Sequence, residues 1–219
     1  MAASAPPSGG SLSAGCPRCS TPVLEADGTW HCPEHGTVAP LWRPAVSSYA
    51  AFADHLTAAG SFPTYLPWPL SPGWHVTDFA VVARPRRPVA TLSCCSGSSD
   101  LDGAVDVTVV SEEPGTGLGS RCAGTTGTDP GPEVGDGPPA VHVRIGARDV
   151  ALWSVSTSRA GPDLDRAVLA GEAEGRWLWL VLRPASALLL LRDDWILRDV
   201  SQVGPPLVEL PFGGPPPHW

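Results

Sequence analysis

The sequence predicts an α+β protein, in which a small Cys/His-rich module precedes a mainly antiparallel β-sheet domain with one or two covering helices. Three observations carry this expectation. Cys and His residues are paired at short spacings before residue 36, one helical stripe of apolar residues follows residue 48, and apolar and polar residues alternate in several later segments. Apolar residues make up 42% of the 219 residues, which is enough for one core domain and an appendage.

The expected organisation follows the composition along the chain. Residues 1–15 are small and polar, so we expect a disordered tail there. The Cys/His block occupies residues 16–36, and a proline-containing linker covers 37–46. The α+β domain is expected over 47–212, and the Pro- and Gly-rich end, 213–219, is expected to be loose.

The first regular element of the larger domain is a helix predicted over 48–59. Ser47 is a suitable N-cap, and Gly60 is a suitable C-terminal stop. The apolar positions that share one face of this helix are Tyr49, Phe52, Leu56 and Ala59. This stripe is expected to pack on a sheet.

Strand patterns dominate the rest of the domain. The predicted strands are 75–83, 89–95, 105–109, 141–145, 149–155, 166–172 and 176–183, with late strands at 195–200 and 207–210. Turns at Gly146 and Gly175 join four of them into two hairpins. The run from Trp177 to Leu182 is apolar on both faces and therefore predicts a central, doubly covered strand. Residues 185–192 predict a short covering helix, and 111–139 a long loop.

The Cys/His block carries the chemistry. Cys16 and Cys19 form a C-x₂-C pair, and twelve residues later Cys32 and His35 form a C-x₂-H pair. Asp27–Gly28 is a hairpin signal between the pairs, so a tight turn is expected to bring them together. Zinc takes four sulfur or nitrogen ligands in a tetrahedron. The pattern predicts a structural Zn²⁺ site, because four protein ligands leave no position open for a catalytic water.

This block, residues 16–36, resembles the zinc-ribbon family, although His35 stands where many ribbons have a fourth Cys. His31 is a rival ligand that would break the pairing geometry, and Trp30 is expected to cover the site. The resemblance implies a metal-held hairpin that contacts nucleic acid or a protein partner. Arg18 is the only basic residue of the block, against three acidic ones, which favours a protein contact or docking within the chain over DNA.

The whole chain also resembles an uncharacterised actinobacterial family that consists of a domain of unknown function. The segments that carry this resemblance are CPRC…CPEHGTV, LPWPLSPGW, EEPGTGLG and AGEAEGRWLWLVLRP. The chain has no Lys and no Asn and is rich in Ala, Gly, Pro and Arg, which indicates a high-GC genome. The resemblance implies architecture and lineage, but no activity.

Charge and hydropathy limit the classes of partner. The net charge is −8, and residues 100–136 hold eight acidic residues and one Arg, so direct nucleic-acid binding is not expected. A short cluster at Arg84, Arg86 and Arg87 is interpreted as a solvated turn. The amino end lacks a signal-peptide pattern, and the apolar run 177–191 is shorter than the roughly 20 residues that span a bilayer. We expect a cytoplasmic protein with reduced thiols and no membrane contact.

Three weaker patterns are interpreted as structural. The loop Gly115–Gly119 resembles an anion-binding turn, but it lacks Lys and the spacing of a phosphate loop, and it follows two glutamates. The remaining thiols, which are expected to be buried, are Cys94, Cys95 and Cys122. The acidic residues that invite comparison with a calcium loop, but lack its spacing, are Asp129, Glu133 and Asp136.

These patterns leave three functional hypotheses. The first is a non-catalytic binding, regulatory or adaptor protein that acts through a protein partner. The second is a small-molecule enzyme of the acyl- or phosphoryl-transfer type that uses the Gly115–Gly119 loop, which would require a deep pocket near Gly117 or Cys95. The third is a transcription-associated ribbon protein that binds a polymerase or a basic partner. The sequence identifies no small-molecule ligand.

Overall fold

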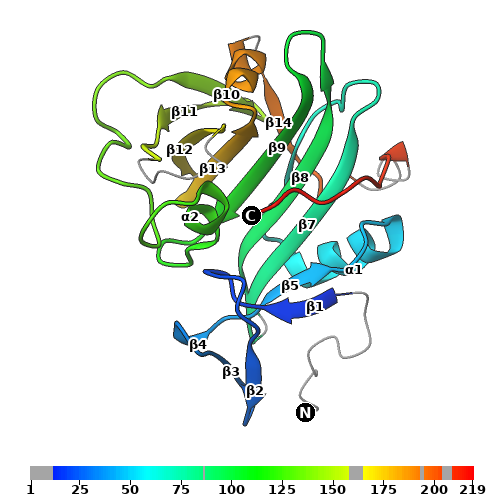
Figure 1. The fold of residues 1–219 in the computed structure, drawn as a ribbon, viewed down its shortest axis with the longest axis vertical. Helices are drawn as coiled ribbons and strands as arrows, with labels where there is room; N and C mark the ends of the chain where they lie inside the picture. The colour runs from blue at the N-terminus through cyan, green and yellow to red at the C-terminus, as the bar shows by residue number, and fades with distance from the viewer. Residues whose placement is uncertain (1–11, 86, 158–164, 193–194, 204–208) are drawn as a thin grey trace.

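The computed structural model describes residues 12–219 apart from 86, 158–164, 193–194 and 204–208 (Figure 1). In this part of the chain the strands form one eleven-stranded sheet and one three-stranded sheet. The sheet-dominated architecture with few helices was predicted correctly. Residues 1–11 of the expected tail lie outside the described residues.

The large sheet is almost entirely antiparallel, with one parallel contact between β10 and β14. Its strands, in order across the sheet, are β1 (Leu12–Gly15), β5 (Leu41–Pro44), β7 (His75–Arg84), β8 (Arg87–Ser99), β9 (Gly103–Glu112), β13 (Arg176–Arg183), β12 (Ala167–Ala173), β11 (Arg148–Ser154), β10 (Val141–Ile145), β14 (Ile196–Asp199) and β6 (Tyr65–Pro67). The helices of the described chain are α1 (Tyr49–Ala59), α2 (Leu118–Ala123) and the 3₁₀ helix η1 (Ala185–Arg192).

Strand β13 lies between β9 and β12 and separates two hydrophobic cores. Leu178, Leu180 and Leu182 belong to one core, whereas Trp179 and Val181 belong to the other. All five side chains are fully buried. Successive residues of a strand point to opposite faces, so the two-sided apolar run serves both cores at once. The prediction of a central, doubly covered strand is confirmed.

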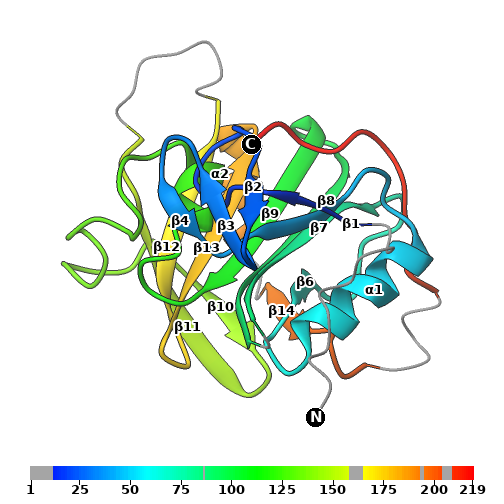
Figure 2. The ribbon, with the colours of Figure 1, turned by 90° about the horizontal axis from the view of Figure 1, so that it is seen from below.

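The sheet curls so that its last strand, β6, lies against β8 and β9 (Figure 2). Hydroxyl groups on β8 fasten this contact, because Thr91 donates to the carbonyl of Pro63 and Ser93 donates to the carbonyl of Tyr65. These bonds satisfy polar groups that are buried inside the molecule.

Helix α1 packs on β7 and begins one residue later than expected. Ser48, rather than Ser47, is the N-cap, and its hydroxyl accepts from the Ala51 N–H at 3.2 Å. Gly60 ends the helix at a φ of 55°, which an L side chain adopts only with strain. The buried positions are Ala51, Phe52, His55 and Ala59. The expected stripe is therefore rotated, and Tyr49 is half exposed.

Several expected irregular segments form regular structure. Residues 12–15, expected in the tail, form β1 and pair with β5 from Leu12↔Pro44 to Gly15↔Leu41. Most of the expected linker, 37–46, lies in β4 (Gly36–Val38) and β5, because its prolines stand before β5 and at its last position, where Pro is tolerated. The loop 111–139 contains α2. Residues 207–208 of the expected strand 207–210 lie outside the described residues, and Glu209 and Leu210 are not in a strand. In the described chain, no helix combines the length and hydrophobicity that crossing a bilayer would require.

Candidate metal centre and its surroundings

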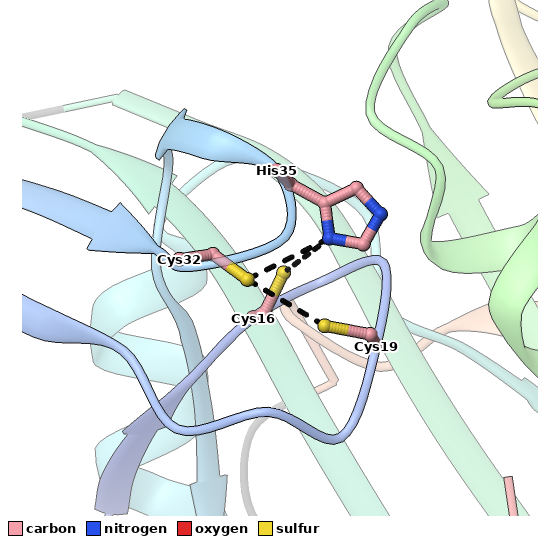
Figure 3. A group of neighbouring side chains, drawn as sticks. All are labelled: Cys16, Cys19, Cys32 and His35. Carbon is pink, nitrogen blue, oxygen red and sulfur yellow. Dashed lines mark hydrogen bonds between the residues drawn. The ribbon is translucent and has the colours of Figure 1, made fainter.

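The Cys/His block folds as the predicted hairpin. Strand β2 (Leu24–Ala26) pairs with β3 (Thr29–Cys32) from Leu24↔His31 to Ala26↔Thr29. The two turn residues, Asp27 and Gly28, have φ values of 51° and 73°, as a type I′ turn requires. Strand β4 then adds to β3 and completes the three-stranded sheet. The Asp-Gly signal is confirmed, and it places the two Cys/His pairs at the same end of the hairpin (Figure 3).

The ligand atoms of Cys16, Cys19, Cys32 and His35 all lie within 4.8 Å of one another (Figure 3). The Cys16 and Cys32 sulfurs are 3.7 and 3.6 Å from His35 Nδ1, and the Cys19 and Cys32 sulfurs are 3.6 Å apart. Three thiols and one imidazole thus converge on a common centre from both pairs. This cluster can bind a metal ion.

The electrostatics of the cluster call for a cation. Burial raises the pKa of Cys16 to about 11, although the Arg18 N–H donates to its sulfur at 3.4 Å. Burial acts in the same direction on Cys32, but hydrogen bonds from His35 and from the amides of Glu34 and His35 lower its pKa to about 6. A cation bound between the sulfurs of Cys16 and Cys32 would favour their ionised forms.

His31 lies outside this cluster, and the Trp30 ring packs against Trp42. The His31 side chain is exposed and its Nδ1 is 3.5 Å from the Thr37 hydroxyl, so the rival ligand does not join the cluster. The Trp30 ring, expected over the site, meets the ring of Trp42 edge-on at a centroid distance of 5.5 Å. Because Trp42 belongs to β5, this contact joins the hairpin to the large sheet.

Two arginines fix the segment around Cys16 against the larger domain. Arg18, which follows Cys16 by two positions, donates to the carbonyls of Gly115 at 2.8 Å and Thr116 at 3.3 Å. Arg121 of α2 donates in the opposite direction, to the carbonyl of Cys16 itself. The Cys/His block therefore has a defined position on the sheet domain.

The last residue of the chain reaches the same junction. The Trp219 ring lies 4.2 Å from the Arg43 guanidinium carbon and 4.7 Å from that of Arg121. Its Nε1 donates to Asp78 Oδ2 at 3.0 Å, and Arg43 forms an ion pair with the same carboxylate at 2.6 Å. Burial raises the pKa of Asp78, and the bonds from Arg43 and Trp219 oppose that effect. Residues 213–219 were expected to be loose; the anchoring of Trp219 was not evident because Pro- and Gly-rich sequence gives no periodic signal.

The Gly115–Gly119 loop does not offer its amides to an anion. The N–H groups of Leu118 and Gly119 donate to the carboxylate of Glu112 at 2.8 and 3.2 Å, the Gly115 N–H donates to Asp129 at 2.7 Å, and the Thr116 N–H donates to the Glu113 carbonyl. The chain's own carboxylates thus occupy the places that a phosphate would take.

Glu112 is the buried group that the sequence did not reveal. Burial raises its pKa to about 7, although the amides of Gly119 and Leu118 and the Trp179 indole favour the charged form. Its carboxylate caps the start of α2 from six residues upstream. The usual capping box places Glu three residues after the N-cap, so no local spacing rule finds this cap.

The three remaining thiols are buried, as expected. Burial raises the pKa of Cys94, Cys95 and Cys122, which keeps these thiols protonated and unreactive at neutral pH. The Cys94 sulfur lies 3.1 Å from the Thr108 hydroxyl. His75 and His142, which could have activated a thiol, are both exposed.

The acidic loop does not assemble a second metal site. Asp129 accepts from the Trp177 indole at 2.9 Å as well as from Gly115, and Glu133 accepts from the Ser156 N–H at 3.2 Å. Across the residues that the structure describes, the cluster around Cys16 is the one group of three or more potential ligands that converge.

A groove of about 1180 Å³ opens between the hairpin and the turn that joins β7 to β8. Figure 1 shows the lower ends of β7 and β8 beside the small sheet. The side chains that contribute charge or aromatic surface to the groove are Arg18, Glu25, Trp30, Trp42, Arg84 and Arg87. The carboxyl end of α1 and the residues Gly115 and Thr116 complete its lining.

Comparison with known proteins identifies one family. The model of DUF6758, described as a family of unknown function, matches residues 11–219. Neither the curated proteins nor the solved structures give a significant match.

Proposed function

Because this chain belongs to DUF6758, a family of unknown function, we propose its function from its own residues: it is a non-catalytic binding or adaptor protein whose amino-terminal zinc ribbon is structural. The observation that carries the proposal is the convergence of four protein ligands from two paired knuckles. Four protein ligands fill the coordination sphere of a structural zinc, whereas a catalytic zinc needs an open position for water.

Zinc is the metal that suits these ligands. Thiolate and imidazole ligands in a tetrahedron favour Zn²⁺ over the harder cations Mg²⁺ and Ca²⁺. Zn–S bonds of about 2.3 Å and a Zn–N bond of about 2.0 Å separate two sulfurs by about 3.8 Å, and a sulfur from the nitrogen by about 3.5 Å. Three of the six separations between the ligand atoms are 3.6 to 3.7 Å, close to these values, and all six lie within 4.8 Å.

The metal would hold the hairpin together. Strands β2, β3 and β4 have three, four and three residues, and the β2 side chains are all exposed, so the module buries little apolar surface. In such modules metal binding supplies the folding free energy. The ribbon would then act as a rigid arm that Arg18 and Arg121 fasten to the sheet domain.

A binding function also agrees with the other candidate sites. The amides of Gly115, Thr116, Leu118 and Gly119 bond to the chain's own oxygens, which opposes the acyl- or phosphoryl-transfer alternative. The thiols outside the cluster are buried and protonated. All six cysteines are free, which supports the cytoplasmic location that we include in the proposal.

Metal analysis of the purified protein tests this proposal. We expect about one zinc per chain, lost in Cys16→Ser and retained in the control Cys95→Ala, which removes a buried thiol outside the cluster. Co-purification from a native lysate should recover a protein partner with the wild-type chain and not with Cys16→Ser. A wild-type chain that folds without any bound metal would contradict the proposal.

A further inference from the structure

We propose that the groove between the ribbon and the β7–β8 turn binds an acidic, extended segment of a partner protein. This inference rests on the proposed binding function and names the chemistry of its partner. Three features of the groove support it: its charge, its aromatic surface and the contacts that hold its walls in place.

The groove is cationic in a protein that is strongly anionic. Its lining contains three arginines, Arg18, Arg84 and Arg87, and one glutamate, Glu25, although the whole chain has a net charge of −8. Such a local excess of positive charge attracts negative groups and repels basic partners. The most complementary occupant is therefore a segment that carries several carboxylates.

Two of the three arginines keep their full charge available. Among the residues that the structure describes, Arg18 and Arg84 form no ion pair, and Arg18 spends its hydrogen bonds on backbone carbonyls. Arg87 pairs with Glu113, but both side chains are accessible to solvent, so this exposed pair contributes little and can exchange its carboxylate. The side chains of Arg18, Arg84 and Arg87 are all exposed, which leaves them open to a ligand.

The floor of the groove offers an apolar surface between these charges. The edge-on pair of Trp30 and Trp42 is half buried and lines the groove together with Pro40, Pro85 and Pro88. Indole rings present flat apolar area at low conformational cost, and grooves lined by aromatic residues accept extended and proline-containing peptides. The occupant should therefore place Leu or Pro between its acidic residues.

The walls of the groove are held in place before any ligand arrives. Arg18 fastens the ribbon to the carbonyls of Gly115 and Thr116, which line the same groove, and the Trp30–Trp42 contact fastens the hairpin to β5. A preformed site lowers the ordering cost of binding. Nucleic acid is the less suitable polyanion, because duplex DNA carries about one negative charge per 1.7 Å and a chain of net charge −8 repels it more strongly than a short peptide with a few carboxylates.

Fluorescence anisotropy with designed peptides tests the inference on the full zinc-loaded chain. The probe is a labelled twelve-residue peptide that alternates Glu or Asp with Leu and Pro, and the matched control peptide has Gln and Asn in place of the acids. We expect saturable binding of the acidic probe, at least tenfold weaker binding of the neutral control, and a loss of affinity when salt is raised from 50 to 500 mM.

Variants place the binding site. Arg84→Glu is expected to weaken the acidic probe at least tenfold, and Trp30→Ala is expected to weaken it several-fold. Arg144→Glu on β10, an exposed arginine outside the groove, makes the same charge change and should alter the affinity less than twofold. Zinc content and the denaturation midpoint of each variant identify any that lose binding by failing to fold; Arg84 lies at a strand end, so its variant should keep both.

The outcomes separate this inference from the proposed function. Equal binding of acidic and neutral peptides, or no binding by a chain with one zinc, would overturn the groove inference and leave the structural ribbon standing. An equal effect of Arg144→Glu and Arg84→Glu would overturn it as well. Tighter binding of a twelve-base-pair DNA duplex than of the acidic peptide would assign the groove to nucleic acid. A dimer that Arg84→Glu dissociates would assign it to a second copy of the chain.

Discussion

One buried histidine of helix α1 should contribute a loss of stability in mild acid. His55 is fully buried, its Nε2 lies 3.0 Å from the Thr64 hydroxyl, and its ring stacks on Phe52 at 5.6 Å. Within the described residues its Nδ1 has no hydrogen-bond partner. Burial lowers the pKa of His55 from 6.5 to about 3, because an imidazolium there would lose its hydration without gaining a counter-ion.

The sign and size follow from proton linkage. Between pH 6.5 and 3 the unfolded chain binds a proton at this residue that the folded chain does not, so the stability is full above pH 6.5 and falls as the pH falls. With pKa values of 6.5 and about 3, the loss between pH 8 and pH 5 is about 2 kcal/mol. A change of this size is a large part of the stability of an ordinary domain.

Urea unfolding at pH 8 and pH 5 measures this effect, with His55→Gln as the perturbation and His142→Gln as the exposed control. The wild type and His142→Gln should each lose about 2 kcal/mol more on acidification than His55→Gln does. Protonation of the metal ligands occurs in all three proteins and cancels in the comparison. Equal losses in the wild type and in His55→Gln would refute the assignment of a neutral, buried imidazole.

Three further substitutions test helix α2 and the contacts that join it to the Cys/His cluster. Gly119→Ala would place a Cβ 2.2 Å from the Trp179 indole nitrogen, and urea unfolding should show a loss of about 2 to 3 kcal/mol. The pKa of Glu112 rises from 4.5 in the unfolded chain to about 7 in the folded chain, so its contribution to stability is full below pH 4.5 and is lost as the pH rises through 7. When the pH is raised from 5 to 8, Glu112→Gln should therefore lose about 2 kcal/mol less stability than the wild type. Trp219→Ala leaves Arg121 without the ring that supports it, and should both lower stability by about 2 kcal/mol and speed the transfer of zinc to a chelator.

Each of these three predictions has its own control. Gly15→Ala, whose added Cβ would meet its nearest neighbour at 3.9 Å, should cost far less than Gly119→Ala, and equal costs would contradict the clash. Parallel pH profiles for the wild type and Glu112→Gln would mean that Glu112 is ionised throughout. Unchanged zinc transfer in Trp219→Ala would show that the Arg121 contact does not steady the knuckle.

Local signals in the sequence predicted the Cys/His cluster and the centre of the sheet. The spacing of Cys16, Cys19, Cys32 and His35 and the turn at Asp27–Gly28 act within about twenty residues, so they can be read without the rest of the fold. The two-sided apolar run of β13 likewise predicts its position in the sheet, because a strand without a polar face must be covered on both sides.

The features that the sequence did not predict depend on contacts between distant segments. Strand β1 pairs with β5, and the prolines around β5 hide the alternating pattern by which the sequence could have predicted either strand. The Glu112 cap depends on a loop that folds back, and Trp219 finds Asp78 across 141 positions of the chain. Neither has a fixed spacing, so no periodicity reports it. His55 was placed on the helix, but its burial follows from the rotation of α1 on β7.

The central place of β13 has a consequence for synthesis on the ribosome. Its neighbour β9 ends at residue 112, whereas β13 begins at residue 176. More than sixty further residues must therefore be synthesised before the second edge of β9 can pair. Until then a nascent chain presents an open row of N–H and C=O groups next to half-built apolar surfaces on either face. Truncations that stop before residue 183 should therefore be prone to aggregation, whereas the finished chain closes that edge with its most apolar strand.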